Sequence, residues 1–331
     1  MRVFITGACG FIGSHLVEKL IKNKHKVRAL TYYNPHDNIG CLKYLDKKIF
    51  DKIEIISGDV RDFQLISNCT KNTDIIIHLA ALIGIPYSYN AVKSYIDTNV
   101  NGTFNILNAA NINNVKKILI TSTSEVYGSA KEVPIKETHP LNAQSPYAAS
   151  KIAADQLALS FFNSFKTPVT IIRPFNTYGP RQSNRAILPT IINQLINGNE
   201  NLKLGNIYPT RDFTYVEDTA DAFIKLLKAR KTEGEIINIG SNFEISIKSV
   251  LEILKKDFKY KFKIMTEEKR VRSKSSEVNR LFASNKKAKK IINWSPQYSH
   301  IKGFKLGLKK TIEWYTAQKI TKKFNVNNYS V

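Results

Sequence analysis

The chain has 331 residues, 43% of them hydrophobic, which is enough for one large folded core or two ordinary ones. Its formal charge of +23 comes from lysines spread through predicted helices and the C-terminal third. This distribution is typical of solvated helix faces and argues against a nucleic-acid partner. No apolar run reaches the ~20 residues of a membrane-spanning helix, and the scattered cysteines lack metal-ligand spacing, so we expect neither a membrane partner nor a metal.

Strands and helices are predicted to alternate along the chain. Apolar runs predict strands over residues 3–6, 27–30, 53–57, 75–79, 117–121, 169–173 and 235–239. Helical periodicity lies near 12–22, 91–111 and 147–164, and later near 188–197, 219–228 and 246–258. Strands that alternate with helices favour a parallel sheet covered on both faces, the doubly wound Rossmann arrangement of the α/β class.

The periodicity becomes less regular after residue 173, and the region around Arg211 is expected to be irregular. We therefore predict a dinucleotide-binding Rossmann domain over 1–172, to which 209–240 returns. A smaller C-terminal α/β substrate domain follows over 173–318, and a mobile tail over 319–331.

Three glycines at Gly7, Gly10 and Gly13 join the first predicted strand to the first helix. Glycines at such a turn let the backbone approach a pyrophosphate, and the helix N-terminus favours negative charge. The pattern alone is a weak signal, but here it lies in a strand–turn–helix unit. Because this unit stands where a signal peptide would be, we expect a cytoplasmic protein. Thr31 replaces the acidic residue that usually bonds the adenosine ribose, so NAD and NADP both stay open.

Tyr147 and Lys151 lie four residues apart in an alanine-rich predicted helix and therefore share a face. A free tyrosine has a pKa near about 10. An adjacent ammonium favours the phenolate, which a base working near neutrality needs. Thr123 is expected to hydrogen-bond the same substrate oxygen as Tyr147. Glu125 adds a carboxylate, which indicates that a second proton is moved, with Ser124 orienting a substrate hydroxyl.

The glycine turn and the Tyr–Lys pair occur together with three further strings: GDVRD at 58–62, HLAA at 78–81 and RPFNTYGPR at 173–181. Over almost the whole chain, this combination resembles extended short-chain dehydrogenases/reductases of the NAD-dependent epimerase/dehydratase family, which act on nucleotide sugars. The resemblance implies a homodimer formed through the helices near 91–111 and 147–164. It also implies a tightly bound, recycled NAD or NADP, held by Gly7, Gly10, Phe11, Ile12, Gly13, Thr31, Asp59, Val60, Leu79, Ala80, Ala81, Tyr147 and Lys151.

The Thr-Ser-Glu triplet at 123–125 narrows the resemblance without settling it. It is similar to the triplet of GDP-mannose 4,6-dehydratases, but UDP-glucuronate decarboxylases share it. In contrast, dTDP-glucose 4,6-dehydratases carry Thr-Asp-Glu, and 4-epimerases lack the glutamate. The strings ALIGIPYSY at 81–89, QSPY at 144–147 and PTRD at 209–212 look most like the 4,6-dehydratases that begin legionaminic acid biosynthesis.

The resemblance thus implies conversion of GDP- or UDP-N-acetylglucosamine to a 4-keto-6-deoxy sugar. The alternatives are a UDP-glucuronate decarboxylase, a sugar 4-epimerase or a non-catalytic nucleotide sensor; the retained Tyr147 argues against the sensor. Arginines suit a diphosphate because the guanidinium presents a planar fork of donors. The implied substrate-binding residues are Tyr87, Asn176, Arg181, Arg211, Arg272 and Glu277.

Overall fold

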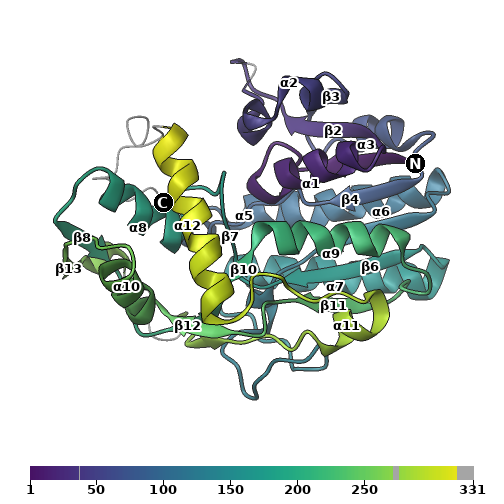
Figure 1. Ribbon diagram of the computed structural model, residues 1–331. Coiled ribbons are helices and arrows are strands. Elements are labelled where there is room, and N and C mark those ends of the chain that lie inside the picture. The colour runs from purple at the N-terminus through teal and green to yellow at the C-terminus, as the bar shows by residue number, and fades with distance from the viewer. Residues whose placement is uncertain (37, 271–275, 319–331) are drawn as a thin grey trace.

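The computed structural model describes residues 1–36, 38–270 and 276–318, so the predicted tail over 319–331 lies outside the described residues. Its centre is a seven-stranded sheet in the order β11-β6-β5-β4-β1-β2-β3 (Figure 1). Every neighbouring pair in this sheet is parallel. The strands are β1 (Arg2–Thr6), β2 (Lys26–Tyr32), β3 (Ile53–Gly58), β4 (Ile75–His78), β5 (Lys117–Thr121), β6 (Val169–Pro174) and β11 (Ile236–Ile239). The predicted Rossmann-type sheet is therefore confirmed.

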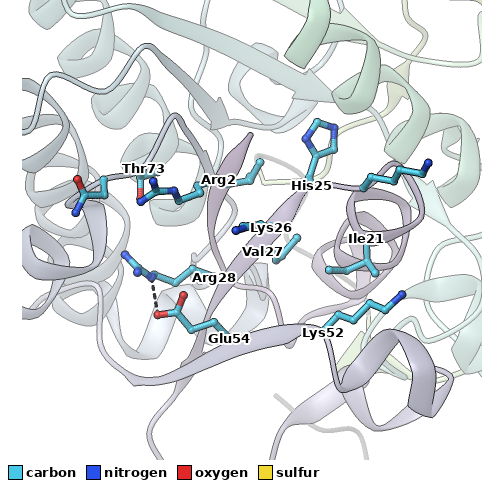
Figure 2. A pocket seen from close by; sticks show the side chains of 12 residues that line it. Arg2, Ile21, His25, Lys26, Val27, Arg28, Lys52, Glu54 and Thr73 are labelled. Atoms are coloured by element: carbon cyan, nitrogen blue, oxygen red, sulfur yellow. Dashed lines mark hydrogen bonds and ion pairs between the residues drawn. The ribbon is translucent and has the colours of Figure 1, made fainter.

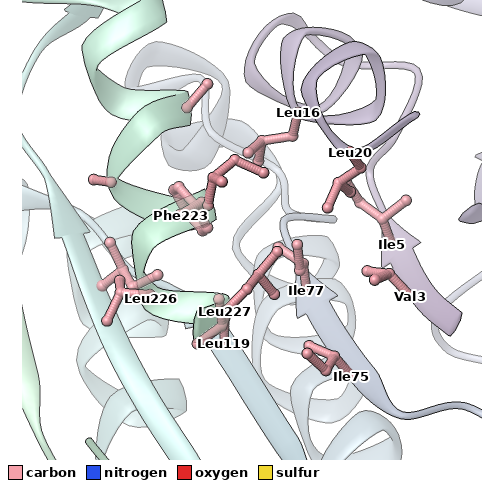
Figure 3. Close-up of a cluster of buried hydrophobic side chains, with 14 of the residues drawn as sticks. Val3, Ile5, Leu16, Leu20, Ile75, Ile77, Leu119, Phe223, Leu226 and Leu227 are labelled. Atoms are coloured by element: carbon pink, nitrogen blue, oxygen red, sulfur yellow. The ribbon is translucent and has the colours of Figure 1, made fainter. Parts of the chain in front are cut away.

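Both faces of the sheet are buried because successive side chains of a strand point to opposite sides. In β1, Val3 and Ile5 belong to one hydrophobic cluster and Phe4 to another, and all three are at most 1% exposed. Figure 3 shows the first cluster, where Leu20 of the first helix lies beside Ile5, and Leu16 lies between Leu20 and Phe223. The helices over this face are α1 (Phe11–Lys22), α9 (Val216–Lys228) and α11 (Lys286–Ile292), and those over the other are α3 (Phe63–Thr70), α6 (Gly102–Ile112) and α7 (Pro146–Phe165).

The single helix predicted over 91–111 is interrupted in the structure. It comprises α5 (Val92–Tyr95), a π-helical segment η2 (Ile96–Asn101) and then α6, preceded by the short α4 (Ile85–Asn90). A π segment is a local widening that often lies at functional sites. Gly102 follows it, and a Cβ there would lie 2.8 Å from Val60, so the helix packs very closely against the turn after β3.

The C-terminal part forms a second hydrophobic cluster beside the sheet, at the left of Figure 1. Its elements are α8 (Ile187–Ile196), β8 (Asn201–Leu204), α10 (Ile247–Lys256), β13 (Lys263–Thr266) and α12 (His300–Gln318). Short strands connect it to the sheet: β7 (Thr177–Tyr178), β9 (Thr210–Asp212), β10 (Thr214–Tyr215), β12 (Glu244–Ser246) and β14 (Arg280–Leu281). The short helical turns are η1 (Gly40–Tyr44), α2 (Lys47–Phe50), η3 (Ser124–Tyr127) and η4 (Glu268–Arg270).

The expectation of an irregular region around Arg211 is wrong. Arg211 lies in β9, which pairs with β12 on one side and β14 on the other. A three-residue strand is too short to show the alternation from which strands are predicted. The chain returns to the main sheet through α9 and β11, but the predicted domain boundaries stay a prediction. Within the described ranges, no helix has the length and apolar content to cross a bilayer.

Candidate active site

The predicted catalytic and cofactor residues converge at the carboxyl edge of the sheet. The glycine turn follows β1, residues 79–81 follow β4, and the Thr-Ser-Glu triplet follows β5. The strand order reverses between β1 and β4, because β1 pairs with β2 on one side and with β4 on the other. Ligands of open parallel sheets bind in the crevice at such a switch point.

The glycine turn has no room for side chains. Gly7 has a φ of +67°, and a Cβ on it would lie 2.7 Å from the backbone nitrogen of Ala80. A Cβ on Gly13 would lie 2.2 Å from the Gly7 carbonyl oxygen. Gly10 precedes α1 and provides no side-chain cap, so amide groups of the first turn are left for a ligand. These features fit a pyrophosphate, as the sequence predicts.

The same turn brings the predicted residues after β4 into place. The backbone N–H of Ala80 donates to the Thr6 hydroxyl at 3.2 Å, and Leu79 N–H donates to the Thr6 carbonyl, which sets Leu79 and Ala80 directly against Gly7. Phe11 and Ile12 of α1 are partly buried against the two hydrophobic clusters on either side of that helix.

The residues predicted to bind the adenosine part of the cofactor are Thr31, Asp59 and Val60, and each has a different side-chain environment. Thr31 is buried, and its hydroxyl donates to the Ile56 carbonyl at 3.3 Å, so this side chain is engaged inside the sheet. Asp59 forms an ion pair of 2.6 Å with Arg61, whose hydrogen bonds hold the pKa of Asp59 below its usual range. Val60 is buried against Gly102.

Helix α7 presents Tyr147 and Lys151 to the triplet. Pro146 is in the first turn, and the Ser145 hydroxyl caps the helix by accepting from the Ala148 amide at 3.1 Å. The Lys151 ammonium donates to the Thr121 carbonyl at 2.7 Å, which fastens the helix to the end of β5.

The triplet begins at Thr123, whose hydroxyl accepts from the Glu125 amide at 3.2 Å. Burial raises the pKa of Tyr147, and Thr123 is near enough to offset part of that rise. The Glu125 carboxylate is close enough to raise the pKa of Tyr147. Ser124 is buried. The five predicted catalytic residues are thus brought together by one strand end and one helix.

The predicted lowering of the Tyr147 pKa by Lys151 is not what the structure shows. Burial is the largest influence on Tyr147 and raises its pKa well above the ordinary value, and the hydrogen bond with Thr123 only partly opposes it. Burial also lowers the pKa of Lys151 to about 8, against the charge of Asp155. The prediction failed because it ignored the cost of burying either charged form.

On the substrate side, Tyr87 and Glu277 approach the catalytic set. The Tyr87 ring lies 6.1 Å from that of Tyr95, which in turn lies 6.2 Å from that of Tyr147, measured between centroids. The backbone carbonyl of Glu277 accepts from Gln144, three residues before Tyr147, at 3.4 Å. The hydroxyls of Tyr89 and Ser276 are hydrogen-bonded, so the segments that carry Tyr87 and Glu277 meet beside this set.

The other predicted substrate residues differ in their surroundings. Arg211 forms an ion pair of 3.4 Å with Glu277, and both side chains are largely buried. The buried side-chain oxygen of Asn176 has no hydrogen-bond partner within the described part of the chain. Arg181 instead pairs with Glu18 of α1 at 2.7 Å. Arg272 lies outside the described residues.

Three buried polar residues beside this site are not among those predicted from the sequence: Tyr127, Asp155 and Arg173. Asp155 and Arg173 form an ion pair of 2.9 Å in which neither side chain is more than 1% exposed. Asp155 is eight residues after Tyr147, two helical turns along the same face of α7. This spacing from Tyr147 is the sequence signal from which Asp155 could have been predicted.

A basic hollow of about 490 Å³ lies at the opposite, amino edge of the sheet. Figure 2 shows Arg2, Lys26, Arg28 and Lys52 around it, with Arg28 paired to Glu54 at 2.9 Å. It is lined by the beginnings of β1 and β2, whereas the catalytic residues follow the ends of strands. The hollow is therefore separate from the candidate active site.

The fold and the site define an extended short-chain dehydrogenase/reductase. The defining features are a Rossmann sheet, a glycine turn after its first strand, and a helix with the Tyr-x-x-x-Lys pair beside Thr123. A model of the GDP-mannose 4,6 dehydratase family matches residues 4–306, and the chain belongs to that family of nucleotide-sugar enzymes.

Known relatives span three chemistries. The chain is 32% identical over 331 aligned residues to dTDP-D-glucose 4,6-dehydratase of Homo sapiens, covering 95% of this chain and 89% of the relative. It is 33% identical over 324 residues to UDP-N-acetyl-alpha-D-glucosaminuronate decarboxylase of Bacillus cytotoxicus, covering 95% and 97%. The crystal structure of UDP-glucuronic acid 4-epimerase from Bacillus cereus with UDP-glucuronic acid and NAD superimposes with a TM-score of 0.86 at 27% identity, covering 96% and 100%.

Proposed function

We propose that this protein is a nucleotide-sugar 4,6-dehydratase. The observation that carries the proposal is the position of Glu125: it lies in the short turn after β5 that Thr123 caps, with its amide bonded to the Thr123 hydroxyl at 3.2 Å. A tyrosine and a lysine suffice for oxidation at one carbon. A second acid–base group beside them supports removal of a proton from the neighbouring carbon.

Tyr147 takes the proton of the sugar 4-hydroxyl, with Thr123 hydrogen-bonded to the same oxygen. Lys151 donates to the Thr121 carbonyl at 2.7 Å and so holds the helix that carries Tyr147 against the end of β5. Glu125 then removes the C5 proton, which the C4 ketone makes acidic, and gives a proton to the departing C6 hydroxyl so that water leaves. Ser124 is a poor acid and orients that hydroxyl.

A bound nicotinamide dinucleotide would supply the redox chemistry, taking up a hydride (two electrons and a proton) from C4 and giving it back at C6, so that no cofactor would be consumed overall. The glycine turn, residues 79–81 and the Asp59–Val60 turn would hold it, and the lack of space at Gly7 and Gly13 supports this assignment. NAD is present in the related 4-epimerase structure. Both NAD and NADP stay candidates for the cofactor. Thr31 offers neither the carboxylate that would bind the ribose of NAD nor the positive charge that would bind the 2'-phosphate of NADP.

For the sugar, we propose GDP- or UDP-N-acetylglucosamine, converted to the 4-keto-6-deoxy product for legionaminic acid or a related surface sugar. Arg211 and Arg272 would bind the diphosphate, with Asn176 and Glu277 beside them, and the net charge of +23 would attract such a dianion. The Arg211–Glu277 ion pair supports this, since the Glu277 carbonyl accepts from Gln144, three residues before Tyr147.

Decarboxylation is the second candidate, because a relative at 33% identity is a UDP-N-acetyl-glucosaminuronate decarboxylase. The two reactions share C4 oxidation and diverge at C5 and C6. Incubation with GDP- and UDP-N-acetylglucosamine and with the corresponding uronates, followed by mass spectrometry, separates them. Loss of water from an N-acetylglucosamine nucleotide supports dehydration; loss of carbon dioxide from a uronate, or no reaction, contradicts it.

We also propose a cytoplasmic homodimer formed through α5, α6 and α7. Large apolar side chains are exposed on these helices: Val92 (44%), Phe104 (42%) and Phe165 (58%). Exposed apolar patches of this kind support an interface between copies of the chain. Light scattering that gave the monomer mass at micromolar concentration would contradict it.

A further inference from the structure

The Thr-Ser-Glu turn ends in a tyrosine that is entirely buried. Tyr127 closes η3, two residues after Glu125, and is 0% exposed. Its hydroxyl accepts from the Arg173 guanidinium at 2.9 Å and donates to the side-chain oxygen of Asn238 at 2.7 Å. The Arg173 guanidinium carbon also lies 4.9 Å from the centre of the Tyr127 ring. Both ends of this side chain are therefore fixed by strands of the main sheet.

The same arginine continues the network to the catalytic helix. Arg173 donates from Nε and Nη2 to one carboxylate oxygen of Asp155, at 3.1 and 2.9 Å. The Ser122 hydroxyl donates to that oxygen at 2.8 Å. Asp155 shares the face of α7 that carries Tyr147 and Lys151, and Ser122 directly precedes Thr123. The network therefore runs from Tyr127, at the end of η3, through Arg173 of β6 and Asp155 of α7 to Ser122, the residue before the triplet.

A buried ion pair of this kind is weak evidence for a role in stability, since apolar replacements are often as stable. What it does provide is a fixed relative position for the groups that it joins. Here these groups are the turn that carries Glu125 and the helix that carries Tyr147. In the proposed function these two residues work on adjacent sugar carbons, where a misplacement of about 1 Å can cost 100-fold in rate.

We propose that Tyr127 is a positioning residue for the elimination step: through Arg173 and Asp155 it holds Glu125 in register with Tyr147. This inference rests on the proposed function. It predicts that loosening the network slows proton removal at C5 more than oxidation at C4. The two half-reactions are then coupled by geometry, and the ketone intermediate is consumed as soon as it forms.

The test compares Tyr127→Phe with Tyr178→Phe. Tyr178 is an equally buried tyrosine, 1% exposed, whose hydroxyl donates to the Phe304 carbonyl at 3.2 Å within the C-terminal cluster. Both variants lose one buried hydroxyl, but Tyr127→Phe leaves two buried partners unpaired and Tyr178→Phe only one. Thermal unfolding is therefore measured for both, and the comparison is made between the two half-reactions of each variant. We expect Tyr127→Phe to slow water loss by about 10- to 100-fold. Reduced nicotinamide should accumulate during its turnover, whereas Tyr178→Phe should behave as the wild type in this respect.

A second readout does not depend on turnover. Amide hydrogen exchange over residues 122–127 should be faster in Tyr127→Phe than in the wild type, and unchanged in Tyr178→Phe. Ser122→Ala removes one hydrogen bond of the same network with less disturbance, and should shift both readouts in the same direction by a smaller amount. If Tyr127→Phe does not fold, the same two measurements on Ser122→Ala test the proposal.

Two results would overturn the inference: equal slowing of C4 oxidation and water loss in Tyr127→Phe, or exchange over 122–127 that matches the Tyr178→Phe control. Failure of the proposed function looks different. In that case the wild type itself would release no water from any nucleotide sugar, while the exchange comparison would still report on the network.

Discussion

The cofactor half and the substrate half of the candidate site are built in different ways. In the first, Gly7 and Gly13 leave no space for even a methyl group against neighbouring backbone. In the second, Arg211 and Arg181 are held by ion pairs with Glu277 and Glu18. Contact with backbone fixes a position rigidly, whereas an ion pair can exchange one anion for another. If the proposed function holds, the cofactor cradle is preformed, and the arginines must exchange their carboxylate partners for the substrate.

The largest expected effect is at Glu125, where the two halves meet. Glu125→Gln keeps the shape of the side chain but removes the base at C5. Water loss should be abolished while some C4 oxidation continues, visible as reduced nicotinamide absorbance when GDP- or UDP-N-acetylglucosamine is added. A variant that still released water at the wild-type rate would exclude Glu125 as the base.

Tyr147→Phe should act one step earlier. Removing the hydroxyl takes away the group that accepts the 4-hydroxyl proton, so turnover should fall by roughly 100-fold or more. No reduced nicotinamide should accumulate, in contrast to Glu125→Gln. Turnover near the wild-type value, with unchanged thermal unfolding, would show that another group takes this proton.

The rigid cradle can be tested at Gly7. Gly7→Ala places a methyl group 2.7 Å from the Ala80 nitrogen at a φ of +67°, so the turn must shift. Gly198→Ala is a matched control, because Gly198 has a φ of +76° and open space around it. We expect both to lose about 1 kcal/mol of stability from backbone strain, and Gly7→Ala to lose more because its methyl group meets backbone. Only Gly7→Ala should also weaken NAD binding, by about tenfold or more, measured by calorimetry. Equal NAD affinities in the two variants would remove the turn from the cofactor site.

In the substrate half of the site, we expect a smaller effect on activity from the replacement of Arg211. A diphosphate contact is present in both ground and transition states, so Arg211→Ala should raise KM several-fold and change kcat less. Arg280→Ala is the control, since Arg280 pairs with Glu244 on an exposed part of the neighbouring strand. If KM were unchanged, or rose equally in the control, Arg211 would not bind substrate.

The same contrast explains what the sequence could predict. The glycine turn and the Tyr147–Lys151 pair are local, because spacing along one turn or one helix determines their geometry. The structure has the predicted strand–turn–helix at Gly7 to Gly13 and one helix that carries both Tyr147 and Lys151. The network at Tyr127 depends on contacts between distant segments, such as its bond to Asn238, 111 residues away. No local pattern shows such a contact. The burial that raises the pKa of Tyr147 is likewise a property of the folded whole.

Helix α12 shows how packing can override a local preference. It contains Gly303 and Gly307, which disfavour a helix by about 1 kcal/mol each relative to alanine, and no helix is predicted there. In the structure a Cβ on Gly303 would lie 2.5 Å from the Tyr298 backbone, and one on Gly307 would lie 2.2 Å from the Tyr178 hydroxyl. The glycines are present because the helix packs so closely against these neighbours.

The central claim is that the enzyme removes and replaces a proton at C5 while it releases water. Wild-type protein incubated in deuterium oxide with GDP- and UDP-N-acetylglucosamine tests it directly, with the product followed by mass spectrometry and NMR. The account predicts a 4-keto-6-deoxy sugar that carries one deuterium at C5, with no net change in the cofactor. A dehydrated product formed at full rate without deuterium at C5 would contradict it.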